Sequence, residues 1–388
     1  MKSYFTHLEC TNCGKIYPSS EPIRVCLSCS KIIYARYNLE QAKSEVSKSS
    51  FNDRLPNMWR YFELLPVLDP NNIVSLGEGF TPIHKAENLG EDLGLENLLI
   101  KDESFNPTDS FKARGMSAAV SKVKEFNIKE LTVPSAGNAG GALAAYAAKA
   151  GLQSHIFMPQ DAPEATQKEV AITNATLNLV DGFINDAGIQ SRELAAKKGM
   201  FDLSTLQEPY RAEGKKTMGY EIAEQLNWNL PDAIIYPTGG GTGIVGIWKA
   251  IQEMEQLGWI SSKRPKMFCI QAEGCAPIVR AFNQKSRFAE AWQNPKTIAA
   301  GMRVPSAIGD YLILDAIYES GGSAITVTDE EMIECVKKTA SLEGLFLCPE
   351  GGATVSASKK LLDLGLINKK DSVLLLNTGS GFKYMEVI

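Results

Sequence analysis

Short apolar runs alternate with longer segments of helical composition from residue 98 onward. The runs are bounded by Gly, Pro or polar residues, which is typical of buried strands. We expect strands at 98–101, 131–134, 155–159, 176–180, 233–237, 267–271 and 373–377. Helices are expected between them, for example at 139–150, 214–226, 243–257 and 329–342. This alternation predicts an α/β protein in which helices flank parallel sheets.

Residues 1–36 lack this alternation and carry two CxxC pairs. Cys10 and Cys13 form the first pair, and Cys26 and Cys29 form the second, twelve residues later. Each pair offers two thiolates from a tight turn, so the spacing predicts a zinc-ribbon-like module with a structural Zn²⁺. Four thiolates leave no open coordination position, so we expect the ion to support folding rather than catalysis. Two disulfides, or a cluster that has lost its metal, are the alternatives.

Residues 37–72 are polar and then aromatic and proline-punctuated, which predicts a connecting arm packed on the body. The remaining cysteines are isolated along the sequence, and we expect them to behave as small buried apolar residues. They are Cys269, Cys275, Cys335 and Cys348.

Length and charge narrow the classes of function. At about 150 residues per domain, 388 residues predict two to three domains. The net charge of −5 is spread without long like-charge blocks, so neither nucleic acid nor a membrane is an expected partner. No apolar run approaches the roughly 20 residues that span a bilayer, and the N-terminus lacks a signal-peptide pattern, which favours the cytoplasm. Only three histidines occur, so a catalytic triad or a His-ligated metal is not expected.

Three glycine-rich turns follow expected strands, the place where open α/β sheets bind ligands. In PSAGNAGG (134–141), Asn138 can hydrogen-bond a substituent of a flat ligand or simply cap the next helix. In PTGGGTGIVG (237–246), backbone N–H groups and a helix N-terminus suit a phosphate. In LLLNTGSGFK (374–383), the hydroxyls of Thr378 and Ser380 either face a heteroaromatic nitrogen of a ligand or belong to an ordinary turn.

The second turn also matches GxGxxG, at Gly241, Gly243 and Gly246. A dinucleotide site would need an acidic residue about twenty residues later to bind a ribose. Glu273 follows the next expected strand, 27 residues after Gly246. A NAD-dependent oxidoreductase is therefore the alternative from a different class.

Lys112 lies in KDESFNPTDSFKARG (101–115), at the start of an expected helix. The positive helix end and apolar neighbours disfavour its ammonium form, which makes the free amine a better nucleophile toward an aldehyde. A solvated surface lysine is the alternative.

NPTDSFKARG resembles the Schiff-base motif of fold-type II pyridoxal 5′-phosphate (PLP) enzymes, the tryptophan synthase β superfamily. The Asn138 turn and the glycine-rich phosphate turn follow in that superfamily's order. Within it, the chain is most similar to threonine synthases, because LGEGFTPI (76–83), EPYRAEGKKTMGYE (208–221), CPEGGAT (348–354) and the N-terminal ribbon resemble segments of that family. The similarity spans nearly all of the chain, whereas a NAD enzyme explains only GxGxxG.

The resemblance implies a two-domain fold. Residues 37–117 and 211–388 would form a large PLP-binding domain, and residues 118–210 a small domain. Lys112 would form the internal Schiff base and Asn138 would hydrogen-bond the PLP 3′-hydroxyl. Thr378 would face the pyridine nitrogen. The cofactor phosphate would be bound by Gly239, Gly240, Gly241, Thr242 and Gly243, and the substrate phosphate by Ser110, Ser204, Thr205, Arg211 and Lys216.

The implied reaction converts O-phospho-L-homoserine and water to L-threonine and phosphate by γ-elimination and β-hydration. The family also suggests a homodimer. Two residues depart from its pattern: Ala113, where threonine synthases often have Asp, and Asp109, where they often have Gly. These departures leave open other enzymes of the superfamily, namely a cysteate synthase, a threonine or serine dehydratase, and a diaminopropionate ammonia-lyase.

Overall fold

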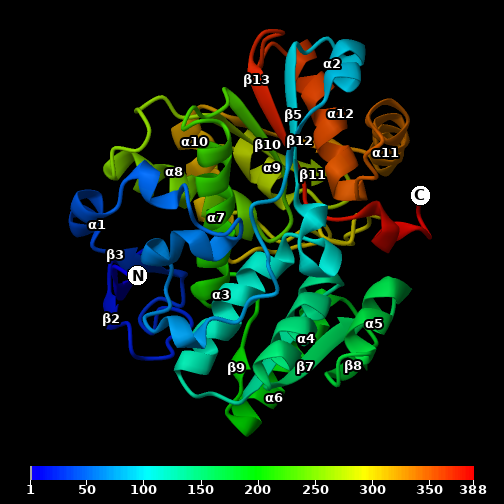
Figure 1. The fold of residues 1–388 in the computed structure, drawn as a ribbon. Coiled ribbons are helices and arrows are strands. Elements are labelled where there is room, and N and C mark those ends of the chain that lie inside the picture. Colours follow the sequence, from blue (N-terminus) through cyan, green and yellow to red (C-terminus); the bar gives the residue numbers. More distant parts are fainter. Residues whose placement is uncertain (1) are drawn as a thin grey trace.

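The computed structural model describes residues 2–388 and contains three β-sheets (Figure 1). Two are built mainly from parallel strands with helices packed around them, and the third is a small antiparallel sheet near the N-terminus. The predicted α/β fold, with helices flanking parallel sheets and a small module before it, is confirmed.

The larger sheet has six strands in the order β12-β11-β10-β13-β5-β4. Only the edge strand β4 runs antiparallel to its neighbour. The central strands are almost entirely buried, which explains why they read as apolar runs without alternation. The strands are β4 (Ile83–Lys85), β5 (Asn97–Asp102), β10 (Ala233–Pro237), β11 (Lys266–Ala272), β12 (Ser323–Val327) and β13 (Ser372–Asn377).

Helices cover both faces of this sheet (Figure 1). One buried cluster joins the sheet to α8 and α10, and another joins its opposite face to α2, α11 and α12. The helices of this part are α2 (Glu87–Leu93), α7 (Tyr210–Gln225), α8 (Thr242–Gln256), α9 (Pro277–Asn283), α10 (Asp310–Ser320), α11 (Asp329–Glu343) and α12 (Pro349–Asp363).

The smaller sheet is parallel, in the order β8-β7-β6-β9, and lies apart from the larger one (Figure 1). Helix α3 contacts both α4, beside this sheet, and α7, beside the larger one. The strands are β6 (Glu130–Pro134), β7 (Gln153–Pro159), β8 (Thr176–Val180) and β9 (Phe201–Asp202). The helices are α3 (Lys112–Glu125), α4 (Asn138–Ala150), α5 (Glu164–Ala171) and α6 (Ile184–Lys198).

The expected boundary between residues 117 and 118 falls inside α3, which is one continuous helix. The boundary between 210 and 211 falls at the start of α7. The division into a large and a small domain stays a prediction.

The N-terminal module is an antiparallel sheet of β1 (Phe5–Cys10), β2 (Ile16–Pro18) and β3 (Ile33–Tyr37). Long-range polar contacts attach it to the body, including an ion pair of 2.7 Å between Arg24 and Asp202. The arm that follows contains α1 (Leu39–Glu45) and three 3₁₀ turns, at Lys48–Phe51, Met58–Leu64 and Pro70–Asn72. Its residues Met58–Leu64 are all buried, so the arm packs on the body as predicted.

All seven expected strands and the four expected helices are found, with bounds within a few residues of those expected. Shorter 3₁₀ turns occur at Glu103–Phe105, Pro107–Asp109 and Gly381–Tyr384. Among residues 2–388, no helix combines the length and apolarity needed to cross a bilayer.

Candidate active site

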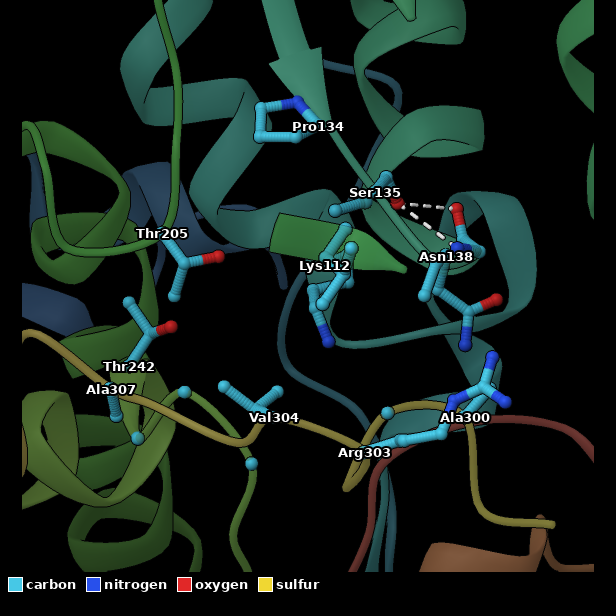
Figure 2. A pocket seen from close by; sticks show the side chains of 18 of the residues that line it. Lys112, Pro134, Ser135, Asn138, Thr205, Thr242, Ala300, Arg303, Val304 and Ala307 are labelled. Atoms are coloured by element: carbon cyan, nitrogen blue, oxygen red, sulfur yellow. Dashed lines mark hydrogen bonds between the residues drawn. The ribbon is translucent and has the colours of Figure 1, made fainter. Parts of the chain in front are cut away.

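A cavity of about 320 Å³ lies where the carboxyl ends of strands from both parallel sheets approach each other. It is bordered by the starts of α3, α4 and α8 and by the end of β13. Figure 2 shows Lys112 between Asn138 on one side and Thr205 and Thr242 on the other. The three glycine-rich turns and the lysine motif therefore meet at one site, as predicted.

Lys112 is the first residue of α3 and lines the cavity. Its ammonium nitrogen lies 4.0 Å from the centre of the Phe111 ring. Burial in these surroundings, together with the nearby charge of Arg211, lowers the pKa of Lys112 to about 8. A much larger fraction of this amine is therefore neutral near pH 7 than for a solvated lysine, as a nucleophile toward an aldehyde requires.

Buried ion pairs fix the helix that carries Lys112. Arg114, fully buried, pairs with Glu103 at 2.6 Å and with Glu221 at 2.5 Å. Lys101 pairs with the same Glu221 at 3.0 Å. Burying charges is costly unless they are fully paired, and here each carboxylate accepts from at least one cation, so the network ties α3 to α7 and β5.

The end of β13 is hydrogen-bonded directly to the lysine motif. The backbone N–H of Phe111 donates to the carbonyl of Thr378 at 3.1 Å, and the N–H of Ser380 donates to the carbonyl of Asp109 at 3.0 Å. The Thr378 side chain lines the cavity, whereas the Ser380 hydroxyl accepts from the N–H of Phe382 at 3.2 Å. Thr378 is thus available to a ligand. The Ser380 hydroxyl instead stabilises the turn, which is the alternative role considered for it.

The turn formed by Gly239, Gly240, Gly241, Thr242 and Gly243 lines the cavity and leads into α8. Gly241 has a φ of +81°, and a Cβ there would collide with the side chain of Ile313. A Cβ on Gly243 would collide with the Tyr236 hydroxyl. The sequence needs glycine at both positions, and the resulting turn presents backbone N–H groups at a helix N-terminus, an arrangement that binds phosphate.

Asn138 is the first residue of α4, and its side chain lines the cavity. Its amide nitrogen donates to the Tyr384 hydroxyl at 3.3 Å, whereas its buried amide oxygen has no partner among the described residues. An unpaired buried polar atom is costly, and a ligand hydroxyl in the cavity would satisfy it. This orphaned oxygen and the glycine turn fit PLP, with its ring hydroxyl near α4 and its phosphate near α8.

The residues expected to bind the substrate phosphate are only partly brought together. Ser204 and Thr205 line the cavity. Arg211 is completely buried close to Lys112; it donates to the Leu203 carbonyl at 2.5 Å, and its Nε and second terminal nitrogen have no partner among residues 2–388. The Ser110 hydroxyl accepts from the N–H of Lys112 at 3.4 Å and so lies at the start of α3.

The prediction for Lys216 is not supported by its position. Its ammonium pairs with Glu213 at 2.6 Å and with Glu253 at 3.0 Å, and it does not line the cavity. Successive residues on a helix face different directions, so the neighbouring Lys215 is the one that faces α3, where it donates to the Lys112 carbonyl at 3.1 Å. The sequence motif indicated a cation here but not which side of α7 would carry it.

Both departures from the family pattern have a local explanation. Ala113 is completely buried in an apolar cluster that includes Met116. Asp109 has a φ of +50°. Glycine adopts this conformation freely and Asp is among the residues that tolerate it, so Asp109 can replace glycine without a change of chain path.

Sequence reasoning missed several residues that border the cavity. Arg303 belongs to a stretch, 284–309, that contains no helix or strand and so has no periodicity to reveal it. Tyr236 ends a strand that was predicted, but nothing in the pattern showed that its hydroxyl would reach Gly243. Tyr384 also borders the cavity. Its signal was present, since it directly follows the third glycine-rich motif.

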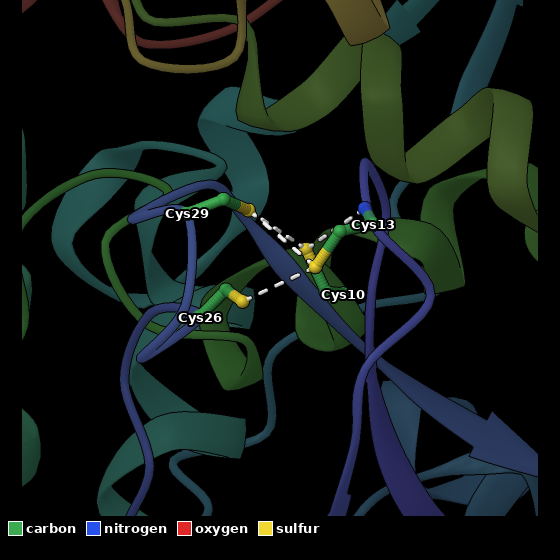
Figure 3. Close-up of side chains that lie close together, drawn as sticks. All are labelled: Cys10, Cys13, Cys26 and Cys29. Carbon is green, nitrogen blue, oxygen red and sulfur yellow. Dashed lines mark hydrogen bonds between the residues drawn. The ribbon is translucent and has the colours of Figure 1, made fainter.

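The four N-terminal cysteines form a separate cluster (Figure 3). Their sulfur atoms all lie within 4.8 Å of one another, with three separations of 3.5, 3.6 and 3.6 Å. Zn–S bonds of about 2.3 Å in a tetrahedron place sulfurs roughly 3.8 Å apart, so Cys10, Cys13, Cys26 and Cys29 fit a Zn²⁺ ion. All four are free thiols, which disagrees with the disulfide alternative.

The isolated cysteines largely follow expectation. Cys269, Cys275 and Cys348 are buried, and Cys335 is half-buried. Cys348 lies next to the site, with its sulfur 3.9 Å from the Thr378 hydroxyl.

Comparisons with known proteins agree with this geometry. Residues 74–379 match the family described as "Pyridoxal-phosphate dependent enzyme". Threonine synthase of Methanocaldococcus jannaschii is 38% identical over 97% of this chain and 92% of the relative. Threonine synthase of Methanosarcina acetivorans is 36% identical over 96% of this chain and 91% of the relative.

Solved structures support the fold. Maize serine racemase superposes with a TM-score of 0.67 at 21% identity, covering 78% of this chain and 88% of the racemase. Threonine deaminase isoform 2 of Solanum lycopersicum gives a TM-score of 0.67 at 20% identity, covering 79% of this chain and 82% of that enzyme. The two sequence relatives, the family match and the site together lead to one statement: the chain belongs to the threonine synthase family of PLP-dependent enzymes.

Proposed function

We propose that this protein converts O-phospho-L-homoserine and water to L-threonine and inorganic phosphate. The observation that carries the proposal is Lys112, an amine with a lowered pKa that borders a cavity between the Asn138 turn and the 239–243 turn. Family membership supports it, since the relatives named threonine synthase align with nearly the whole chain.

In this proposal, Lys112 would hold PLP covalently and the 239–243 turn would bind its phosphate through backbone N–H groups. Asn138 would hydrogen-bond the ring hydroxyl, and Thr378 would be the partner of the pyridine nitrogen. When bound, the cofactor supplies an electron sink for the carbanionic steps. The Thr378 hydroxyl is a neutral partner, so it favours the positive charge on the pyridine nitrogen less than a carboxylate would.

Lys112 is also the group placed to move protons. After the substrate amine displaces Lys112 from the cofactor, the freed Nζ would accept the proton from the substrate Cα and, once that proton has been passed on, one from Cβ. Phosphate leaves from Cγ with the electrons of the broken C–O bond. The two protons taken would be delivered to Cγ and back to Cα, while water supplies the hydroxyl at Cβ and its remaining proton goes to the departing phosphate. The lowered pKa of Lys112 allows one nitrogen to both take and return protons near neutral pH.

The substrate phosphate needs its own anion site, distinct from the cofactor turn. Arg211 has two unpartnered guanidinium nitrogens, although it lies behind the residues that line the cavity. Thr205 offers a hydroxyl on the cavity wall, whereas the Ser204 hydroxyl donates to Asp202 at 2.7 Å. A guanidinium suits a phosphoester because it can donate two parallel hydrogen bonds. Ser110 remains a candidate donor at the start of α3, whereas the paired Lys216 is left out of the proposal.

A comparison of substrates tests the proposal against its rivals. The purified protein, loaded with PLP, is incubated with phosphohomoserine, with phosphoserine plus sulfite, and with free threonine or serine. We expect threonine and inorganic phosphate in equal amounts from phosphohomoserine, and loss of this activity in Lys112→Ala. Ketobutyrate from threonine as the main product would indicate a dehydratase, and cysteate from phosphoserine plus sulfite a cysteate synthase.

The setting of the enzyme is part of the same proposal. We assign it to the cytoplasm, where a thiolate zinc cluster stays reduced. Its partner is a small amino-acid phosphate, and neither nucleic acid nor a membrane is assigned to it. By its family we also assign it a homodimeric state.

A further inference from the structure

The hydroxyl of Tyr236, near the end of β10, is a buried donor without a partner beside the cavity. The residue is 2% exposed and borders the cavity. Its Oη is buried and has no hydrogen-bond partner among residues 2–388. A buried hydroxyl without a partner is costly, so a ligand that accepts its proton gains an interaction that the protein itself does not satisfy.

The neighbours of Tyr236 fix where this hydroxyl lies. The ring of Phe111, which directly precedes Lys112, packs edge-on against the Tyr236 ring, with 6.3 Å between the ring centroids. The hydroxyl occupies the place that a Cβ on Gly243 would take. Gly243 follows Thr242, the first residue of α8, so Oη lies beside the first turn of that helix. The free backbone N–H groups of a helix are in its first turn, where anions bind.

A phosphate is the partner that suits this hydroxyl. Burial and the negative charge of Glu103 raise the pKa of Tyr236 well above its ordinary value, so the hydroxyl keeps its proton and can donate it. A phosphate monoester offers several acceptor oxygens and carries most of its second negative charge at pH 7. Hydrogen bonds to such a charged acceptor are stronger than those between neutral groups.

We propose that Tyr236 donates a hydrogen bond from Oη to the cofactor phosphate bound at the 239–243 turn. The inference rests on the proposed binding of PLP at Lys112. It goes further, because it adds a side-chain donor from β10 to a turn that otherwise offers backbone N–H groups and the Thr242 hydroxyl. It also explains why residue 243 is glycine, since a side chain there would displace the donor.

Two aldehydes that differ only in the 5′-phosphate, PLP and pyridoxal, test the inference. Each is titrated into the cofactor-free protein, and its dissociation constant is determined from the absorption band. In Tyr236→Phe we expect the dissociation constant of PLP to rise roughly tenfold or more, the effect of losing one hydrogen bond to a charged group. The dissociation constant of pyridoxal should change by less than about twofold, because it lacks the acceptor.

Tyr210→Phe is the matched control. Tyr210 is also fully buried, and its hydroxyl also has no partner among the described residues, but it does not border the cavity. Each substitution removes a costly unpaired hydroxyl, so neither should lower the melting temperature of the cofactor-free protein. Only Tyr236→Phe should weaken the binding of PLP.

Three outcomes overturn the inference. The first is an unchanged dissociation constant of PLP in Tyr236→Phe. The second is an equal loss of affinity for PLP and pyridoxal, which indicates that the hydroxyl only supports the shape of the cavity. The third is a raised KM for phosphohomoserine with unchanged affinity for PLP, which places the hydroxyl against the substrate phosphate instead.

Failure of the proposed function gives a different result. Borohydride reduction of the PLP-loaded wild-type protein, followed by peptide mass analysis, should place the cofactor on Lys112. A protein that binds no PLP, or that carries it on another residue, overturns the proposed function itself.

Discussion

Lys112 combines a half-buried, desolvated side chain with the absence, among residues 2–388, of a carboxylate within ion-pair distance, and this combination sets its chemistry. Most buried lysines in this protein have a carboxylate within ion-pair distance, as Lys101 has Glu221 at 3.0 Å. Lys112 has only the more distant Glu350, while Arg211 acts in the opposite direction on its pKa. At the scale of the residue, the reactivity of Lys112 has a simple cause. Its amine is desolvated and has no carboxylate close enough to stabilise the charged form, so the neutral form is favoured.

The pKa of Lys112 predicts how cofactor binding depends on pH. Its pKa lies near 8 instead of 10.5, so the fraction of neutral amine rises with pH, reaches one half near pH 8 and levels off roughly one to two pH units higher. We expect the rate at which the cofactor-free protein takes up PLP to follow the same curve, measured by absorption after rapid mixing. Arg211→Met removes a positive neighbour and should shift the midpoint to higher pH. A midpoint near 10.5 in the wild-type protein would contradict the prediction.

At the scale of the element, two short segments have distinct functions: the 239–243 turn and the segment that carries the four N-terminal cysteines. The glycine turn before α8 is sterically tight on both sides, since Ile313 and Tyr236 occupy the space beside Gly241 and Gly243. The cysteine cluster joins the end of β1 and the turn after it to the loop between β2 and β3. We expect the glycine turn to bind the cofactor phosphate and the cysteine cluster to stabilise the N-terminal module through a zinc ion.

Gly241→Ala should weaken PLP binding by roughly tenfold or more. The Cβ would collide with Ile313, and the φ of +81° is strained for alanine, costs that together reach about 1–3 kcal/mol. The dissociation constant is measured by titrating PLP into the cofactor-free protein. Gly365→Ala is the matched control: Gly365 has a φ of +69° with no atom within 4 Å of the added carbon. Equal affinities for the two variants would refute the steric argument.

Removal of zinc should destabilise the whole protein. The module is attached to the body through contacts such as the Arg24–Asp202 pair and the Tyr37–Glu213 hydrogen bond of 2.8 Å. Because structural zinc contributes directly to folding, we expect one Zn²⁺ per chain, and we expect chelation or Cys29→Ser to lower the melting temperature by several degrees. Metal content is determined by mass spectrometry.

Cys335→Ser is the control for this experiment, since Cys335 is half-buried and lies outside the cluster. It should keep full zinc content. The prediction fails if the wild-type protein binds no zinc, or if zinc is lost without any change in the melting temperature.

At the scale of the whole molecule, an ion pair joins the cavity wall to the smaller sheet. Arg303, from the 284–309 stretch, lies 3.0 Å from Asp161, which follows β7 in the smaller sheet. Asp161 is 58% exposed at its side chain, so the pair is worth at most about 1 kcal/mol. That energy is small for the stability of the whole protein, but the pair restrains the side chain of Arg303, which lines the cavity.

Asp161→Asn should raise the KM for the amino-acid substrate by up to about fivefold at low salt. Loss of the pair frees Arg303, which lines the cavity, to leave its position there, and salt screening should reduce the difference from wild type. Steady-state kinetics at two ionic strengths provide the measurement. Asp363→Asn removes a pair of 2.6 Å with Lys359 on the surface of α12 and should leave KM unchanged. A salt-independent effect would exclude the bridging role.

Much of the fold and part of the site could be predicted from the sequence because the signals are local. Buried strands such as Ala233–Pro237 read as uninterrupted apolar runs, and Lys112, Asn138 and the 239–243 turn belong to contiguous motifs. Other features of the site depend on the direction in which a side chain points in the folded protein. Lys216 differs from Lys215 by one helical position, and Arg303 reaches the cavity from a stretch without regular structure. Contacts of that kind are fixed by packing, which the motif does not encode.

The position of β13 has a consequence for how the chain is made. This strand, Ser372–Asn377, inserts between β10 and β5 in the middle of the larger sheet. While a ribosome is still adding residues before 372, the strands already synthesised form two halves with unpaired edges toward each other. Such edges attract other chains, so the nascent protein must rely on chaperones or on rapid completion until its central strand emerges.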